Sequence, residues 1–452
     1  MLILQFVGGA ALVQRLGRAT RQRAASVRTP ATQLVVHGYS APEFVRVRDA
    51  LWRQLKRTGG GAAVSVYYQG ECVVDVWGGV RDETGRPWER DTLSVSFSTT
   101  KGVASTALHL LVDRGLVDYD APVARYWPEF AQAGKTAITV RQLMSHQAGL
   151  YGLSELAERA EDLLDWELMV ARLAAAAPAH RPGSHSAYHA LTYGFLVGEI
   201  VRRVSGRPFS EFIRTELAEP LELDGLYIGA PDEALARAAR LMRLPGGERA
   251  AVSQRLPAEV RRRQRAEKAR RRERVAWLLE RGLRAAGVPA DLTQARRAFI
   301  TPGIGRLDFS DPQVLRASIP AANGLFTARS LAKLYAALAG GGQLAGVRLI
   351  SERTLRRATE VQTSGSDRVV LFPMRWRLGY HFVGTSFGVP KRAFGHFGFG
   401  GSGAWADPTR NLSFAMVLNS GIGTPFGDLR TVWLSGQALR GADRVYRDQR
   451  RR

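Results

Sequence analysis

The chain contains one cysteine, Cys72, among its 452 residues. A single cysteine excludes an intramolecular disulfide and any cysteine-rich metal site. Because Cys72 lies in an alternating run typical of a strand, we expect it to pack in a core. Lysine is also scarce, since only six of the 64 basic residues are lysines. A motif that contains a lysine can therefore be checked against every other lysine of the chain.

Long apolar runs are missing as well. The apolar opening, residues 1–13, is shorter than the roughly 20 residues that cross a bilayer. Arginines follow this stretch instead of preceding it, which is the reverse of a secretory signal. Residues 1–42 carry five arginines and no acidic residue. We predict a basic, disordered tail over residues 1–36 and a cytoplasmic protein, with peripheral membrane contact through its basic segments as an option.

Acidic residues are few relative to basic ones, and the net charge is +23. The excess is local, because residues 231–300 hold 18 basic and 8 acidic residues and residues 440–452 hold 6 and 2. The rest of the chain, without these two segments and the first 42 residues, is close to neutral. The net charge of the whole chain therefore does not indicate the chemistry of a site. The arginine-rich segment 255–286 allows three interpretations: a solvated helix, a lid or membrane contact, or a nucleic-acid surface. Since no aromatic platform is interleaved with its arginines, we expect no nucleic-acid partner.

The order of predicted elements favours an α+β fold. A hairpin is predicted over residues 62–77, after a helix over 42–55, and strand patterns return only at 377–382, 392–397, 403–407 and 412–419. Helical periodicity fills the sequence between them. We therefore predict one antiparallel sheet built from residues 37–115 and 310–436, and an inserted helical domain over 116–309 that includes the basic segment 231–300. Residues 437–452 are predicted to be a second basic tail.

A candidate nucleophile site opens the first helix of this arrangement. Residues 98–101 read Ser-Thr-Thr-Lys, and residues three apart share one face of a helix. The Lys101 amine could therefore take the hydroxyl proton of Ser98, and the helix N-terminus would stabilise an oxyanion. This chemistry is acyl transfer through a serine ester. The spacing recurs at Ser330 and Lys333, where Thr327 is a good N-cap, and we interpret that second pair as structural.

Two later segments supply partners for Ser98. Tyr188 precedes a helix with an apolar face and could act as a base if nearby positive charge removed its proton. Residues 394–403 are glycine-rich around a predicted strand, and glycines permit close approach of a ligand or another backbone. The N–H of Phe399 could then join that of Ser98 in an oxyanion hole.

These segments together resemble the serine β-lactamase-like hydrolases. Ser98-Thr-Thr-Lys101, Leu-Met-Ser-His146-Gln-Ala-Gly-Leu, Tyr188-His-Ala190 and His396-Phe-Gly398 follow in the order found in that family, between residues 37 and 436. The resemblance is greatest to the class C-related family VIII carboxylesterases. It implies a β-lactamase/D,D-peptidase-like fold with Ser98 as nucleophile, Lys101 and Tyr188 as general bases, and His396, Gly398 and Phe399 on the substrate-binding strand. It implies neither a cofactor nor a metal.

Two departures from the family pattern bear on the substrate. Ala190 replaces the asparagine of Tyr-x-Asn, and His396 replaces the lysine of Lys-Thr-Gly, so that a residue only partly charged near neutral pH faces the substrate. Both changes remove polar groups that hold a β-lactam or a peptide. We therefore expect a small-molecule ester as substrate, with β-lactamase or D,D-peptidase activity, or a non-catalytic scaffold, as alternatives.

Two further patterns are weaker. Residues 384–388 match the Gly-x-Ser-x-Gly nucleophile elbow around Ser386, but no helix follows, as that elbow requires. His185 and His189 are four residues apart, yet no third ligand is placed to complete a metal site. We expect both histidines at the rim of a cleft.

Overall fold

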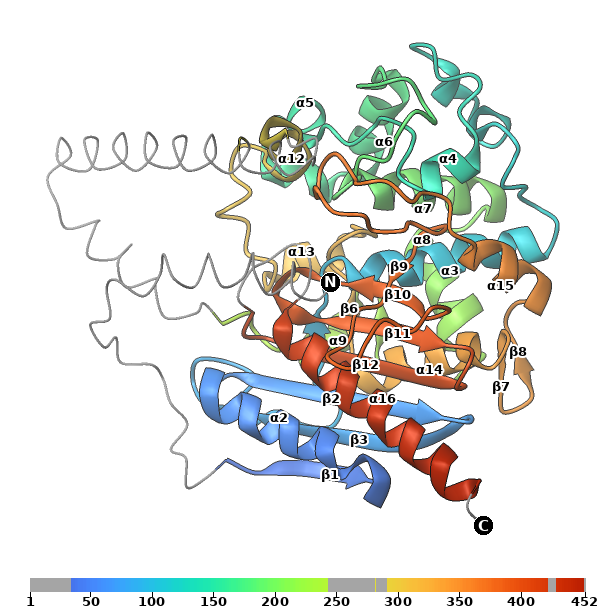
Figure 1. Cartoon of the computed structure of the whole chain (residues 1–452). Coiled ribbons are helices and arrows are strands. Elements are labelled where there is room, and N and C mark those ends of the chain that lie inside the picture. The colour runs from blue at the N-terminus through green and yellow to red at the C-terminus, as the bar shows by residue number, and fades with distance from the viewer. Residues whose placement is uncertain (1–33, 243–280, 282–290, 422–427, 451–452) are drawn as a thin grey trace, which may run out of the picture.

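The computed structural model describes residues 34–242, 281, 291–421 and 428–450. The expectations for residues 1–33, and for the arginine-rich segment apart from Arg281, lie outside these residues. The described part is an α+β fold in which a helical region lies against a sheet that both ends of the chain build (Figure 1). The predicted fold class is confirmed.

The main sheet has seven antiparallel strands in the order β1-β3-β2-β12-β11-β10-β9. Its first three strands precede residue 80 and its last four follow residue 380, so β2 pairs directly with β12. The strands are β1 (Val36–Ser40), β2 (Gly61–Tyr68), β3 (Glu71–Gly79), β9 (His381–Phe382), β10 (Phe394–Phe397), β11 (Gly403–Asp407) and β12 (Leu412–Leu418).

Helices cover both faces of this sheet. On one face lie α2 (Val45–Thr58) and α16 (Leu429–Gln449), and on the other lie α3 (Thr99–Asp113) and α14 (Ala328–Ala339). The period-2 alternation of β2 explains this, because Val64 and Val66 pack into the core under α2 while Ala63 belongs to the core on the opposite face. Apolar burial on both faces fixes the register of the strand.

The helical region lies beside α3 and positions the second half of the site. Its longest helix, α7 (Thr192–Ser205), packs on α3. The other helices are α4 (Val140–Met144), α5 (Leu153–Leu156), α6 (Trp166–Ala175), α8 (Phe209–Ile213), α9 (Asp232–Leu235), α12 (Leu292–Phe299), α13 (Pro312–Arg316) and α15 (Glu352–Thr359). Shorter 3-10 or π turns are η1 (Pro42–Phe44), η2 (Val123–Arg125), η3 (Pro128–Ala131), η4 (Ala160–Leu164), η5 (Arg214–Ala218) and η6 (Phe399–Gly401).

Two small sheets complete the fold. Strand β6 (Leu325–Phe326) lies between β4 (Ser94–Val95) and β5 (Leu226–Tyr227), and β7 (Gln343–Leu344) pairs with β8 (Val347–Arg348). Strand β4 leads directly to Ser98, so the first of these sheets fixes the entry to α3.

Residues 437–449, which the sequence set apart as a basic tail, belong to α16 (Figure 1). The helix continues because Leu439 and Ala442 are buried against the sheet while the arginines face solvent. Gly441, which looks like a helix breaker, lets the helix approach Phe44, whose ring would be 2.4 Å from an added Cβ. Within the described residues no helix is long and apolar enough to cross a membrane.

Candidate active site

Ser98 lies where the chain turns from β4 into α3. Phe97, the preceding residue, has a φ of 43°, a left-handed conformation that is rare for a bulky residue. Ser98 caps the helix, and one turn later Lys101 places its Nζ 3.0 Å from the Ser98 Oγ. The predicted pairing of serine and lysine on one helix face is therefore present. The strained turn at Phe97 presents the Ser98 side chain at the helix N-terminus.

Lys101 is completely buried. Its Nζ donates to the backbone carbonyls of Ala190 at 2.7 Å and Ala321 at 3.0 Å. Among the described residues no carboxylate pairs with it, and burial lowers the pKa of the Lys101 amine well below its ordinary value. A neutral amine has two N–H donors and one lone pair. The two carbonyls use both donors, so the lone pair is left for the hydroxyl of Ser98.

Tyr188 reaches Ser98 from the segment that precedes α7. Its hydroxyl donates to the Ser98 Oγ at 2.8 Å, and its ring lies 5.0 Å from the Lys101 Nζ. Burial and the nearby carboxylate of Asp367 raise the pKa of the Tyr188 phenol above its ordinary value, although the hydrogen bond to Ser98 opposes the shift. Tyr188 is therefore protonated. The expectation that positive charge ionises it is wrong, because burial dominates the shift and raises the pKa of the phenol.

Asp367 and Trp376 hold Tyr188 in place, and the sequence analysis missed both. Asp367 Oδ1 accepts the backbone N–H groups of Tyr188, Val369 and Val370 at 2.9–3.0 Å, and its Oδ2 accepts the Trp376 indole N–H at 2.9 Å. The Trp376 ring stacks on Tyr188 with an interplanar angle of 4°. Burial raises the pKa of Asp367 while the donors counteract this. All four partners donate, so they fit the ionised form.

Gly398 brings the end of β10 against the start of α3. An added Cβ at Gly398 would lie 2.2 Å from the Ser96 carbonyl oxygen and 3.0 Å from the Thr99 Oγ1. Only a glycine therefore permits this approach. Within the described residues, the backbone N–H groups of Ser98 and Phe399 have no hydrogen-bond acceptor. The Phe399 ring packs on Phe97, with centroids 5.5 Å apart, and it remains partly exposed.

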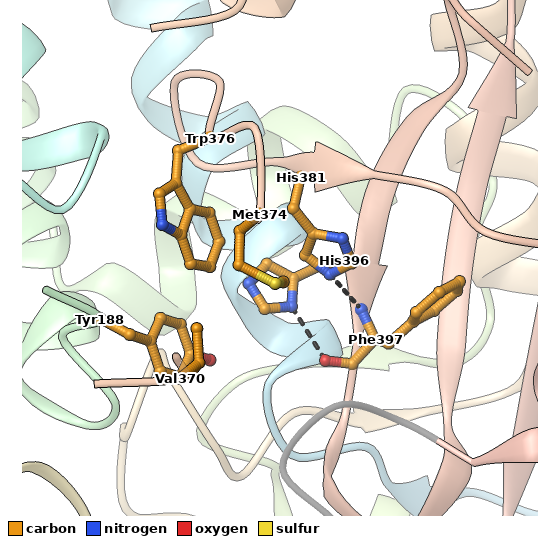
Figure 2. Close-up of a pocket in the computed structure, with 7 residues that line it drawn as sticks. All are labelled: Tyr188, Val370, Met374, Trp376, His381, His396 and Phe397. Atoms are coloured by element: carbon orange, nitrogen blue, oxygen red, sulfur yellow. Dashed lines mark hydrogen bonds between the residues drawn. The ribbon is translucent and has the colours of Figure 1, made fainter. Parts of the chain in front are cut away.

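Two histidines bind the backbone of Phe397, the last residue of β10, beside Tyr188. His396 Nδ1 donates to the Phe397 carbonyl at 3.0 Å, while His381 Nε2 accepts the Phe397 N–H at 3.1 Å (Figure 2). Burial and the neighbouring His381 and Lys101 lower the pKa of His396 well below its ordinary value. His396 is therefore neutral, and the expectation of a partly charged ring is wrong because the ring is buried.

A small pocket opens between these groups (Figure 2). Its cavity volume is about 20 Å³, and its lining consists of Tyr188, Val370, Met374, Trp376, His381, His396 and Phe397. Most of this surface is apolar or aromatic. Through Tyr188, the pocket adjoins the hydroxyl of Ser98.

The remaining histidines do not form a metal pair. His189 is fully buried, where its Nδ1 donates to the Ala187 carbonyl at 2.7 Å and its Nε2 accepts the Leu150 N–H at 3.0 Å. His185 instead stacks on His180, with centroids 3.9 Å apart. The expectation that His189 lies at a cleft rim is therefore wrong. Among the residues with coordinates, no group of three metal-ligating side chains occurs.

The other two candidate serines have structural surroundings. Ser330 follows the N-cap Thr327 of α14, and its hydroxyl donates to Asp224 Oδ1 at 3.1 Å. The structural interpretation of this pair is confirmed. Ser386 lies in the loop between β9 and β10, where its N–H donates to the carbonyl of Val432 in α16 at 3.1 Å.

The comparisons with known proteins agree with this geometry. A family model described as Beta-lactamase matches residues 47–436. The chain belongs to the β-lactamase family. It is 39% identical over 388 residues to the esterase/β-lactamase LipL of Mycobacterium tuberculosis, a match that covers 85% of this chain and 83% of LipL. It is also 34% identical over 194 residues to esterase EstB of Burkholderia gladioli, of which 49% is covered.

Solved structures of the same family superpose closely. A family VIII carboxylesterase has a TM-score of 0.75 at 35% identity, over 90% of this chain and all of that one. A penicillin-binding protein homologue from Caulobacter crescentus has a TM-score of 0.75 at 36% identity over the same shares. The chain is therefore a serine hydrolase of the β-lactamase family, and the resemblance in its sequence motifs is confirmed.

Proposed function

We propose that this protein is a serine carboxylesterase that hydrolyses small esters through an acyl-enzyme on Ser98. The observation that carries the proposal is the buried Lys101, whose Nζ lies 3.0 Å from the Ser98 Oγ and has no carboxylate partner among the described residues, so that burial lowers its pKa. A neutral amine at this distance can take the hydroxyl proton without a further base. The esterases among its relatives support the same activity.

In the acylation step, Lys101 Nζ takes the Ser98 proton while Ser98 Oγ bonds to the ester carbonyl carbon. The oxyanion that forms lies against the N–H groups of Ser98 and Phe399, which have no other acceptor in the part of the chain that the structure describes. The tetrahedral intermediate collapses by breaking the bond to the alcohol oxygen. The Tyr188 hydroxyl protonates that oxygen, and the proton held by Lys101 restores Tyr188. The protonated state of Tyr188 supports this role as a donor.

In the deacylation step, water gives a proton to Lys101 and its oxygen attacks the acyl carbon. The bond between the acyl carbon and Ser98 Oγ then breaks, and the proton held by Lys101 passes to Ser98 Oγ. Acid is released and the enzyme returns to its starting state. The same two N–H groups stabilise the second oxyanion.

An ester fits this site better than a β-lactam or a peptide. At position 190 the chain has a methyl group that cannot hold a substrate amide, and only the Ala190 carbonyl takes part, as an acceptor for Lys101. His396 is neutral, and its one N–H group already donates to the Phe397 carbonyl. It therefore cannot pair with a substrate carboxylate. A neutral ester needs neither contact.

Labelling with a fluorophosphonate tests the nucleophile, with mass spectrometry to locate the adduct. We expect one adduct on Ser98, its loss in Ser98→Ala, and its retention in the matched control Ser330→Ala. An adduct that survives Ser98→Ala would place the nucleophile elsewhere, and absence of any adduct would favour a scaffold. For the substrate class, we expect turnover of p-nitrophenyl butyrate to exceed that of nitrocefin and of a D-Ala-D-Ala peptide, and the opposite order would overturn the ester assignment.

A further inference from the structure

One buried acceptor in the pocket beside Ser98 has no donor. His396 is 2% exposed, and its Nδ1–H donates to the Phe397 carbonyl at 3.0 Å. In the neutral ring the other nitrogen, Nε2, then carries a lone pair and no proton. Nε2 is buried without a hydrogen-bond partner among the described residues. In Figure 2 it lies on the side of the ring toward Trp376 and Tyr188.

The other polar groups around the pocket are already satisfied. His381 donates through Nδ1 to the Phe382 carbonyl at 2.7 Å and accepts through Nε2 from the Phe397 N–H. The Tyr188 hydroxyl donates to Ser98. Val370, Met374 and Phe397 present apolar surface. A ligand in this pocket therefore meets apolar walls and one free acceptor, His396 Nε2.

An acceptor of this kind discriminates between ligands by what they can donate. A carboxylate would place its charge against a lone pair, and an alkyl group would leave Nε2 buried and unpaired, which destabilises the complex. A hydroxyl or an amide N–H would pair with it. A site whose buried polar group needs a partner rejects an analogue that lacks that partner more strongly than an apolar pocket rejects a small change in size.

We propose that this pocket selects esters that carry one uncharged hydrogen-bond donor close to the reacting carbonyl, and that His396 Nε2 accepts from that donor. The cavity volume of about 20 Å³ has room for about one water-sized group, so the donor must be as small as a hydroxyl or an N–H group. His396 is in this respect a specificity residue for the substrate. The inference rests on the proposed esterase activity, because it concerns the part of the ester bound beside Ser98.

The test compares esters that differ only by a hydroxyl and a methyl group of similar size. The first set compares both enantiomers of p-nitrophenyl 3-hydroxybutyrate with p-nitrophenyl 3-methylbutyrate. The second set makes the same comparison at position 2, between p-nitrophenyl 2-hydroxybutyrate and p-nitrophenyl 2-methylbutyrate. We expect kcat/KM for the hydroxylated ester to exceed that of its methyl partner by about tenfold in at least one pair, as one net hydrogen bond provides. A p-nitrophenyl hemisuccinate, which carries a carboxylate, should be the poorest substrate.

Variants then assign the preference to His396. In His396→Leu we expect the ratio of the two kcat/KM values to fall to about one, and this ratio does not depend on the fraction of enzyme that folds. Met374→Leu changes the same pocket without changing a polar atom, so its ratio should stay at the wild-type value. A ratio that persists in His396→Leu, or that falls equally in Met374→Leu, would overturn the assignment to His396.

Measurements on the wild-type enzyme alone separate a failure of the donor preference from a failure of the esterase assignment. If p-nitrophenyl butyrate is hydrolysed and no hydroxylated ester is preferred, the inference fails while the proposed function stands. If none of these esters is hydrolysed and Ser98 takes no fluorophosphonate, the proposed function fails first.

Discussion

Replacing Asp367 by asparagine should loosen Tyr188 and lower both stability and turnover. Asp367 Oδ1 accepts three backbone N–H groups and Oδ2 accepts the Trp376 indole N–H. The asparagine oxygen can keep the three backbone bonds only if its NH₂ group faces the indole donor. One bond to a charged acceptor is then lost and two donors meet in a buried site. Each effect costs about 1–3 kcal/mol, so we expect Asp367→Asn to reduce the free energy of unfolding by about 2–6 kcal/mol.

The partner variant provides a double-mutant cycle. Trp376→Phe removes the same hydrogen bond from the other side and should cost less, because Oδ1 keeps its donors. In the double variant the asparagine NH₂ no longer faces a donor. We expect the two costs to be less than additive by about 1–2 kcal/mol, measured by urea unfolding.

Turnover separates positioning from a general loss of stability. Because Asp367 holds the Tyr188 backbone, we expect kcat for p-nitrophenyl butyrate to fall at least tenfold per folded enzyme in Asp367→Asn. Asp162, a buried carboxylate in the helical region that pairs with Arg172 at 2.7 Å, is the matched control. Asp162→Asn should lower stability without changing kcat per folded enzyme. Additive single variants, or equal kcat losses in Asp367→Asn and Asp162→Asn, would refute the reasoning.

Three further predictions address the reaction itself. Gly398→Ala would place a Cβ 2.2 Å from the Ser96 carbonyl oxygen, so the segment after β10 must move away from α3. We expect kcat to fall about 10²-fold or more, while circular dichroism shows that the protein remains folded. A wild-type kcat would contradict a close-packed oxyanion hole. Log kcat/KM should rise with pH as Lys101 loses its proton, and it should reach a plateau below the ordinary lysine pKa of about 10.4 because burial lowers the pKa of Lys101. This rise should persist in Tyr188→Phe. Its loss in that variant would assign the base to the tyrosine. Lys101→Arg keeps positive charge but cannot act as a base, and we expect a loss of about 10³-fold or more in kcat, with activity close to wild type ruling out the lysine as base.

The nucleophile segment could be predicted from the sequence because its geometry is local. Ser98 and Lys101 are one turn apart, and a helix alone brings them together. The sheet could be predicted for a similar reason, since β2, β11 and β12 alternate with period 2 and end at turn residues. Strand β9 is shorter than the predicted 377–382, because Arg377 N–H donates to the Tyr380 carbonyl at 2.8 Å and closes a turn there.

The residues that hold Tyr188 could not be predicted in the same way. Asp367 lies 179 positions from Tyr188, and no local motif marks it. The burial of a carboxylate depends on donors that four separate backbone and side-chain groups bring together in the folded chain. The charge states of Tyr188 and His396 were predicted wrongly for the same reason, because desolvation sets them and burial is a property of the assembled site.

The pairing of β2 with β12 has a consequence for how this enzyme is made. While the ribosome is still adding residues after position 400, β2 has no neighbour on the side that β12 later covers. The nascent chain therefore exposes an open edge of apolar strand, which can pair with other chains. The segment after β10 that carries Gly398 and Phe399 also arrives late, so an incomplete chain has Ser98 but lacks one of the two N–H groups that we propose for the oxyanion hole. Esterase activity should consequently appear only once β10 to β12 have been synthesised, and chains that stop before β12 should aggregate.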